Sequence, residues 1–190
     1  EACIRIAQEN YTDSKLPQYQ LENVNTAITA LEELQIECSE EIIQNALKHL
    51  YKNTGYQKRM EIIQENPKII LDVSHNKEGL EQTMKAVKEI CKGRIFCILG
   101  STIDREIDTE FMSVFFNTEL HFCTFKNKRS KSKKDWEIIN SICKTEVPIE
   151  TNVNNAFNNI SNIMTSKDLL IVTGSFFLLS DLNLHPKHKT

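Results

Sequence analysis

An apolar segment in the first half of the chain ends in three side chains that can do chemistry. Residues 69–71 are Ile-Ile-Leu, and Asp72, His75 and Asn76 follow within the next five positions. Together they offer a carboxylate acceptor, a titratable imidazole and an amide that both donates and accepts hydrogen bonds. An apolar run of this kind predicts a strand buried on both faces, and such strands deliver polar residues to the carboxyl edge of an α/β sheet. The pattern therefore predicts that Asp72, His75 and Asn76 are presented to a ligand rather than buried.

The same residues also allow a purely local interpretation. Asn76 suits the N-cap of a following helix, and Ser74 or Asp72 can accept hydrogen bonds from free amides. The local sequence by itself favours this capping interpretation, so the rest of the chain has to decide between the two.

Two turns elsewhere carry further candidate groups. Gly174 and Ser175 lie between an apolar strand and an apolar segment, the layout in which backbone amides meet an anion at a helix N-terminus; a plain tight turn fits them as well. Asp104, Arg105 and Glu106 follow another predicted strand and place two carboxylates around a guanidinium. The alternative there is a solvated salt bridge of little consequence.

Two basic features complete the candidates. Arg59 lies just after the helical first part, and arginine can bind phosphate through two parallel donors, although an exposed arginine with no ligand is the alternative. Residues 126–134 contain six basic residues in nine, a density typical of nucleic-acid sites. No aromatic residue is interleaved and the chain is acidic overall, so a solvated loop leading into the helix of Trp136 is favoured.

Several well-known motifs are missing. The sequence has no G-x-x-x-x-G-K-[ST] phosphate loop, no G-x-G-x-x-G, no H-E-x-x-H and no G-x-S-x-G nucleophile turn. If this chain handles a nucleotide, the main phosphate cradle must come from elsewhere.

The composition is that of an ordinary globular protein. Of 190 residues, 40% are hydrophobic and 26% charged, and the net charge of −3 gives no general reason to expect nucleic-acid or membrane binding. No apolar run is long enough for a membrane span, and no signal peptide opens the chain. The cysteines are scattered without a C-x-x-C pair, which predicts core residues in a reducing cytosol and argues against a zinc or disulfide framework; they are Cys3, Cys38, Cys91, Cys97, Cys123 and Cys143.

The elements that position these groups fall into two parts. Up to about residue 53 the apolar spacing is helical only, with Ser39 able to cap the second helix and Gly55 suited to a left-handed residue after its end. From residue 56 strands and helices alternate, which predicts an α/β domain with a mostly parallel sheet and helices on both faces. The predicted strands are residues 68–73, 94–99, 119–125 and 168–173, with a short one near 148–149.

Four segments in order carry a family resemblance. Residues 19–27 resemble a His-Gln-x-x-Asn-x-x-x-Ala helix with Tyr19 for histidine, and residues 59–61 resemble Gly-Arg-x-Glu with Lys58 for glycine. Residues 71–76 match Leu-Asp-Gly-Ala-His-Asn, and residues 172–178 match Thr-Gly-Ser-x-x-Leu. Together they resemble the C-terminal region of folylpolyglutamate synthase/dihydrofolate synthase, in the Mur ligase superfamily. The Asp-x-x-His-Asn form favours the folate branch over the peptidoglycan ligases, and the turn at residues 104–106 stands where the family has Asp-Lys-Asp.

The resemblance implies a domain organisation and an activity. Residues 1–55 would be the helical tail of a truncated central, ATP-binding domain, and residues 56–190 the Rossmann-like C-terminal domain. Such enzymes use ATP and Mg²⁺ to phosphorylate a carboxylate, and the amine of glutamate then attacks the acyl phosphate. The phosphate loop and most magnesium ligands would lie outside this chain, which we expect to have no activity alone and to contribute no metal ligand.

The resemblance also implies roles for individual residues. Asn23 and Arg59 would contact ATP, at the adenine edge and the phosphates. Asp72 would accept a ribose hydroxyl, and His75 would donate to a phosphate oxygen or orient Asp72, so that both join catalysis and ATP binding. Ser175 would hold the glutamate carboxylate.

The expected partners are small molecules: folate or dihydropteroate, L-glutamate and ATP. We expect a cytoplasmic monomer that binds neither nucleic acid nor membranes. Two alternatives stay open, another Mur-type ligase with a different acceptor and a non-catalytic ligand-binding module of the same fold.

Overall fold

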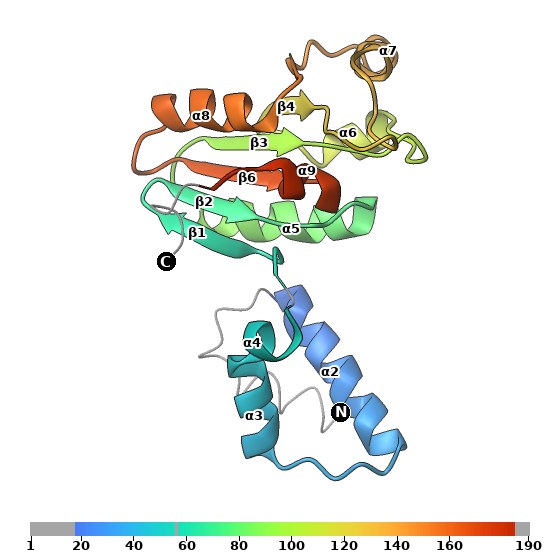
Figure 1. The fold of residues 1–190 in the computed structure, drawn as a ribbon, viewed down its shortest axis with the longest axis vertical. Helices are drawn as coiled ribbons and strands as arrows, with labels where there is room; N and C mark the ends of the chain where they lie inside the picture. The colour runs from blue at the N-terminus through green and yellow to red at the C-terminus, as the bar shows by residue number, and fades with distance from the viewer. Residues whose placement is uncertain (1–17, 56, 185–190) are drawn as a thin grey trace. The chain divides into compact units, whose positions relative to one another are not determined.

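A computed structural model of the chain describes residues 18–55 and 57–184 (Figure 1). The chain divides into two compact units, residues 1–57 and 58–190, and each is described by itself. The boundary between them lies two residues after the one expected from the sequence, between 55 and 56.

The described part of the first unit consists of helices. They are α2 (Gln18–Glu33), α3 (Glu40–Lys48) and α4 (Leu50–Thr54). Ser39 caps α3 as predicted, because its side chain accepts a 3.4 Å hydrogen bond from the backbone N–H of Ile42. Gly55 follows α4 with φ +67°, the left-handed conformation predicted for it.

The second unit is built on a six-stranded sheet in the order β1-β2-β6-β3-β4-β5. All neighbouring strands pair in parallel except β1, which runs antiparallel to β2. The five predicted strands are present, whereas β1 was not predicted. The strands are β1 (Glu61–Glu65), β2 (Lys68–Leu71), β3 (Ile95–Leu99), β4 (Glu119–Cys123), β5 (Ile149–Glu150) and β6 (Leu169–Thr173).

Helices cover both faces of this sheet (Figure 1). They are α5 (Lys77–Ile90), α6 (Thr109–Ser113), α7 (Lys133–Cys143), α8 (Val153–Ile163) and α9 (Phe176–Asp181). Alternate residues of the central strands face opposite sides: Leu170 of β6 packs in the core under α8 and α9, and Ile171 in the core under α5, α6 and α7. Each central strand is therefore apolar without interruption, and the predicted α/β fold class is confirmed.

Two of the described cysteines, Cys97 and Cys123, are core residues as predicted, whereas Cys38, Cys91 and Cys143 are only partly buried. Cys38, Cys91, Cys97, Cys123 and Cys143 are free, and Cys3 lies outside the described residues. Cys97 and Cys123 are buried in the strands, and this burial raises the pKa of the Cys123 thiol to about 12. These two thiols therefore act as small core side chains. Across residues 18–55 and 57–184, no helix is both long and apolar enough to cross a membrane.

An ion pair between the exposed Arg94 and the buried Asp168 ties β3 to β6 at the amino edge of the sheet. Asp168, 3% exposed, accepts hydrogen bonds from the Arg94 backbone N–H at 2.8 Å, the Arg94 guanidinium at 2.9 Å and the Thr165 N–H at 2.8 Å. Burial alone would raise the pKa of the Asp168 carboxyl, but these donors outweigh burial and hold the pKa well below its usual range.

Replacing Asp168 with Asn should lower the free energy of unfolding by about 1–3 kcal/mol at pH 7, because hydrogen bonds to a buried carboxylate are lost. The depressed folded-state pKa means that Asp168 stabilises the fold above about pH 4, its unfolded pKa, and that this stabilisation disappears as the pH falls through the folded pKa. Urea denaturation at several pH values should therefore show the two proteins converging in acid. The exposed Glu119, 3.7 Å from Arg94, provides the control: Glu119→Gln should change little, and equal losses in both variants would contradict the assignment.

Candidate functional site

Three loops meet at the carboxyl edge of the sheet. The backbone N–H of Gly174 donates to Ser74 O at 2.9 Å, that of Gly100 donates to Thr173 O at 3.1 Å, and the Thr173 hydroxyl donates to Ser74 O at 3.3 Å. These bonds join the ends of β2, β6 and β3. The helix after β2 packs on one face of the sheet and the helix after β6 on the other, so this edge is a topological switch point, where open α/β sheets bind ligands.

Two glycines make this close approach possible. A Cβ on Gly174 would lie 2.2 Å from Gly100 O, and its φ of +95° disfavours any other residue. A Cβ on Gly100 would lie 3.0 Å from the Leu178 side chain of α9. The loops after β6 and β3 therefore pack backbone against backbone at the site.

Asp72 is buried, which corrects the prediction that it is presented to a ligand. It is 0% exposed. Its Oδ1 accepts hydrogen bonds from Ser74 N at 2.8 Å and from the Thr83 hydroxyl at 3.1 Å, and its Oδ2 accepts from Met60 N at 2.9 Å. All these partners are donors, so both carboxyl oxygens of Asp72 are used as acceptors inside the protein and the side chain is an internal anchor.

Thr83 is the functional partner that the sequence reasoning missed. It is fully buried on the face of α5 that carries Leu80, Met84 and Val87. Its hydroxyl lies 3.0 Å from the Ser74 hydroxyl and donates to Asp72. A threonine on an otherwise apolar helical stripe was the available signal, because a buried hydroxyl needs a partner.

His75 is exposed, as predicted. Its Nδ1 lies 3.1 Å from Val73 O. A hydrogen bond in which Nδ1–H donates leaves Nε2 facing away from the backbone as an acceptor, or as a donor when the ring is protonated. The ring bonds Val73 rather than the Asp72 carboxylate, so the expectation that His75 orients Asp72 is wrong.

Asn76 is exposed and occupies the N-cap position directly before α5, but its side chain does not cap the helix. Its side chain makes no cap bond and instead donates to Glu78 Oε2 at 3.3 Å. The capping interpretation is therefore wrong for this side chain, and the first-turn amides of α5 have no side-chain cap. Such amides favour an anion in front of them.

Ser175 has a structural bond of its own. Its side chain is the N-cap of α9 and accepts a hydrogen bond from Phe177 N at 3.2 Å. The residue is only 4% exposed. Its hydroxyl hydrogen remains available to donate, and its role with glutamate stays a prediction.

Arg59 lies in a tightly constrained segment. Lys58 and Met60, on either side of it, both have left-handed backbones, with φ +62° and +50°. Asp72 anchors this segment through Met60 N, and Val73 N donates to Lys58 O at 2.8 Å. Lys58, which stands where the resemblance expects glycine, thus adopts a conformation that glycine adopts without strain. Arg59 is half-buried beside the end of β2.

Asn23 lies on α2 in the first unit, where its side chain is exposed. The structure therefore brings Arg59, Asp72, His75 and Ser175 together in the second unit and leaves Asn23 in a unit described by itself. Its predicted contact with adenine stays a prediction.

In the turn after β3, Asp104 forms an ion pair with a different arginine from the one expected from the sequence. Asp104 accepts both hydrogen bonds of its ion pair from Arg129, at 3.0 and 3.1 Å, and not from the adjacent Arg105. Hydrogen bonds from the Thr102 side chain and from Arg129 lower the pKa of the Asp104 carboxyl to about 2. The loop after β4 is therefore fastened to the turn after β3.

The described residues do not fit a magnesium ion. No group of three or more His, Cys, Asp or Glu side chains among them is arranged to hold a metal, and the one carboxylate beneath the site, Asp72, has its oxygens occupied by internal donors. No step of the chemistry is therefore assigned to a metal held by these residues.

The fold and the site define a class of protein. It is an open, mostly parallel α/β domain with helices on both faces of the sheet, and an uncapped helix and an exposed histidine lie at the switch point, where folds of this class bind their ligands. Residues 58–176 match the family described as "Mur ligase, glutamate ligase domain". The chain belongs to the Mur ligase family.

Curated relatives confirm the resemblance expected from the sequence. The chain is 24% identical over 176 residues to the dihydrofolate synthase/folylpolyglutamate synthase of Bacillus subtilis, which covers 92% of this chain and 40% of that protein. It is 26% identical over 165 residues to the protein of the same name from Buchnera aphidicola subsp. Baizongia pistaciae, covering 86% and 37%. The chain thus spans at most 40% of the length of these two relatives.

Solved structures share the fold. The bifunctional folylpolyglutamate synthase/dihydrofolate synthase of Yersinia pestis, complexed with AMPPNP and Mn ion, superposes with a TM-score of 0.69 at 20% identity, over 82% of this chain and 36% of that one. E. coli FolC in complex with DHPP and ADP gives a TM-score of 0.68 at 22% identity, over 83% and 37%.

Replacing Asp72 with Asn should lower the free energy of unfolding by about 2 kcal/mol, because an amide NH₂ would face Met60 N–H, Ser74 N–H or the Thr83 hydroxyl. Replacing the exposed His75 with Ala should change it by less than about 0.5 kcal/mol. Urea denaturation at pH 7 measures both. An Asp72→Asn variant as stable as the parent would show that the carboxylate is not the anchor described here.

Proposed function

We propose that this chain is part of an ATP-dependent ligase that joins glutamate to folate or dihydropteroate through an acyl phosphate. The observation that carries the proposal is the exposed His75 beside the uncapped start of α5, at the switch point of the sheet. Membership of the Mur ligase family and the names of the two curated relatives support it.

Each residue then has a role that follows from its surroundings. His75 donates from Nε2 to a phosphate oxygen, with the α5 amides facing the same anion. Arg59 neutralises phosphate charge, and Asn23 pairs with the adenine edge through its amide. Ser175 donates its hydroxyl hydrogen to the glutamate carboxylate. Asp72 is a positioning residue that fixes the loop carrying His75, because the ribose contact expected of it needs an exposed carboxylate.

The division of labour follows from what this chain lacks. Its sequence has no phosphate loop, and its described residues offer no magnesium cluster. We therefore assign the phosphate cradle and Mg²⁺ to parts of the ligase other than these residues, which span 40% of the Bacillus subtilis relative. The segment described here supplies the second wall of the ATP site and the glutamate contacts.

A second acceptor class has support of its own. The chain is 33% identical over 93 residues to UDP-N-acetylmuramoyl-L-alanyl-D-glutamate–2,6-diaminopimelate ligase of a Nostoc species, a match to 47% of this chain and 18% of that protein. A Mur-type ligase with a different acceptor is therefore the second candidate. Supplying each acceptor in turn to the assay below separates the two.

The isolated chain should release no ADP from ATP in the presence of glutamate and acceptor, because the phosphate cradle is absent. Joined to the ATP-binding part of the Bacillus subtilis relative, it should release ADP in a glutamate-dependent way, and His75→Ala should lower turnover about 100-fold. A coupled ADP assay measures both.

The matched control is His49→Ala in the first unit. His49 follows the end of α3, and its Nδ1 lies 3.0 Å from the backbone carbonyl of Asn45, as the Nδ1 of His75 lies close to that of Val73. It should retain its turnover. Clear turnover by the isolated chain would contradict the division of labour, and unchanged turnover in His75→Ala would remove His75 from the site.

A further inference from the structure

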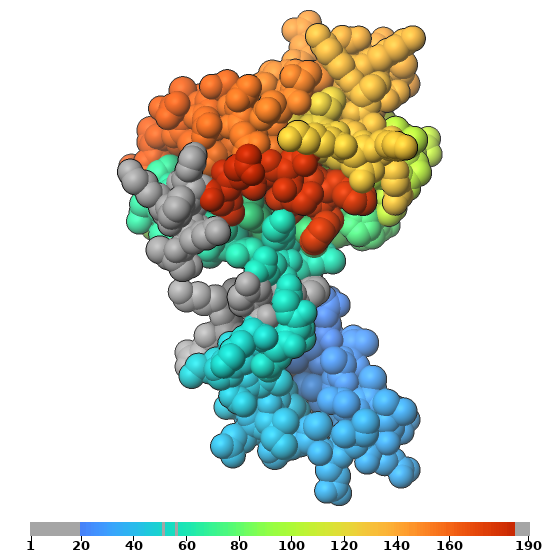
Figure 2. All heavy atoms as spheres, viewed as in Figure 1, coloured from blue at the N-terminus to red at the C-terminus, as the bar shows by residue number. Residues whose placement is uncertain are grey.

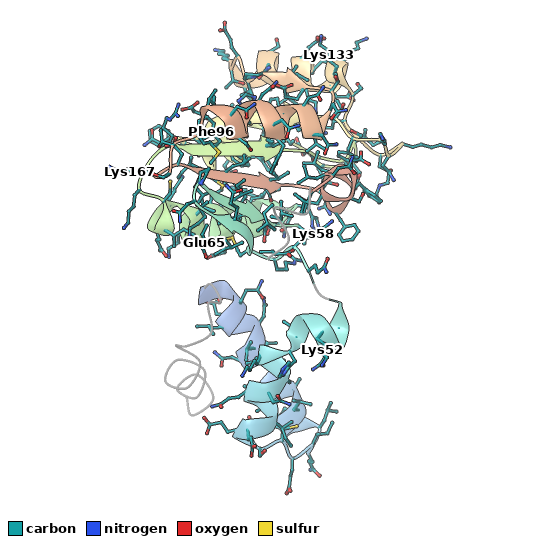
Figure 3. All side chains as sticks on the ribbon, turned by 60° about the vertical axis from the view of Figure 1, so that its left-hand side comes forward. Lys52, Lys58, Glu65, Phe96, Lys133 and Lys167 are labelled. Atoms are coloured by element: carbon teal, nitrogen blue, oxygen red, sulfur yellow. The ribbon has the colours of Figure 1, made fainter. Side chains whose placement is uncertain are left out.

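The side chain of Lys58 joins two segments of the proposed site that are far apart in the sequence. Its ammonium Nζ donates a 3.0 Å hydrogen bond to Leu179 O of α9, 121 positions further along the chain. Figure 2 shows α9 (red) at the surface of the second unit, and Lys58 is labelled in Figure 3. Lys58 directly precedes Arg59, and Ser175 is the N-cap of α9. The bond therefore connects the segment assigned to the phosphates with the helix that follows the residue assigned to glutamate.

The ammonium supplies the end of α9 with a donor that the helix itself does not provide. The last carbonyls of a helix lack intrahelical partners. In a longer helix Leu179 O would accept from Asn183 N, but Asn183 N donates to Asn154 Oδ1 at 2.7 Å instead. Lys58 takes that place, where the helix dipole favours a positive charge. Because α9 has only six residues and a helix of that length is not stable by itself, contacts at its end also hold its start.

A second contact of the same ammonium lies at the start of α9. Nζ is 5.3 Å from the ring centroid of Phe176, within the range of a cation–π interaction. Phe176 is the first residue of α9, next to Ser175, and it is 62% exposed. Leu179 N in turn donates to Ser175 O at 3.2 Å. Lys58 therefore contacts both ends of the helical turn that begins at Ser175.

The charge of Lys58 is not used in an ion pair within residues 18–55 and 57–184. The nearby Glu61 carboxylate accepts a 3.0 Å hydrogen bond from the backbone N–H of Lys58. Burial lowers the pKa of the ammonium, and the charge of Glu61 acts in the opposite direction. The hydrogen-bond and ring contacts of the ammonium are both made with α9.

The backbone at position 58 makes a lysine there costly. Its φ of +62° is a left-handed conformation that only glycine adopts without a steric penalty. The family resemblance expects glycine at this position, so the contact with α9 is a feature of this chain and not of the motif. A strained residue beside a functional site points to a role for its side chain.

We propose that Lys58 is a positioning residue for glutamate, which fixes Ser175 relative to Arg59 by holding α9. This inference rests on the proposed function, in which Arg59 contacts the phosphates of ATP and Ser175 the glutamate carboxylate. The amine of glutamate has to meet the acyl phosphate, so the distance between these two contacts has to be fixed.

The test is Lys58→Met in the joined enzyme, because methionine keeps the apolar stem of the side chain and removes the ammonium. KM for glutamate should rise about tenfold as Ser175 loses its position. KM for ATP should stay unchanged, because the bonds of Lys58 O to Val73 N and of Met60 N to Asp72 still hold the segment of Arg59. The coupled ADP assay, with each substrate varied in turn, measures both, and a general loss of stability would not separate them.

The matched control is Lys88→Met. Lys88 Nζ also donates to a backbone carbonyl of the second unit, Val114 O at 3.3 Å, but Lys88 lies in the last turn of α5, away from the carboxyl edge. This variant should keep both KM values.

A second variant, Lys58→Gly, removes the whole side chain and adopts the left-handed backbone without strain. It should raise KM for glutamate as Lys58→Met does. An unchanged KM for glutamate in both Lys58 variants, equal rises for ATP and glutamate, or the same rise in Lys88→Met would each overturn the proposal.

Hydrogen exchange on the 190-residue chain separates this outcome from that of the proposed function, because it needs no ligase activity. The amides of α9 should exchange faster in Lys58→Met than in the parent or in Lys88→Met, and unchanged exchange would show that Lys58 does not hold α9. Ligase activity without a glutamate-specific change would overturn the positioning role alone. An absence of ligase activity in the joined enzyme itself would overturn the proposed function, while exchange would still report on the contact of Lys58 with α9.

Discussion

A carboxylate without access to water has to find its hydrogen-bond donors inside the protein, and Asp72 finds them in three separate segments. Met60 N belongs to the segment before β1, Ser74 N to the loop after β2, and the Thr83 hydroxyl to the second turn of α5. Since an unpaired buried charge is strongly destabilising, these segments can adopt only arrangements that keep all three donors in place. The positions of Arg59 and His75 both follow from this one group.

Of the polar side chains that follow β2 at the carboxyl edge of the sheet, some are buried and others are exposed to solvent. Asp72 and Ser74 are buried in the hydrogen-bond network, whereas His75, immediately after them, is exposed. Gly174 completes the division, because its missing side chain lets the loops after β6 and β3 close over the strand ends. The backbone that carries the exposed His75 is therefore fixed by hydrogen bonds on both sides of it.

The sequence predicted the parallel strands because each is buried on both faces and reads as an unbroken apolar run. It did not predict β1, where the two isoleucines are adjacent and a register shift near Ile62 breaks the alternation. The burial of Asp72 was equally hidden. A carboxylate at a strand end looks the same whether it faces a ligand or the donors of Met60 and Thr83, because those donors come from segments that only the fold brings together.

Charged side chains with little exposure in this unit differ in how their charges are satisfied. Asp72 and Asp168 each accept hydrogen bonds from three donors, and their charges are fully used inside the protein. Lys131 is 6% exposed and makes no salt bridge with the described residues, but its ammonium is not among the buried atoms that lack a partner. The Asp72 carboxylate is therefore a structural group, although it lies at the edge of the sheet where α/β folds bind their ligands.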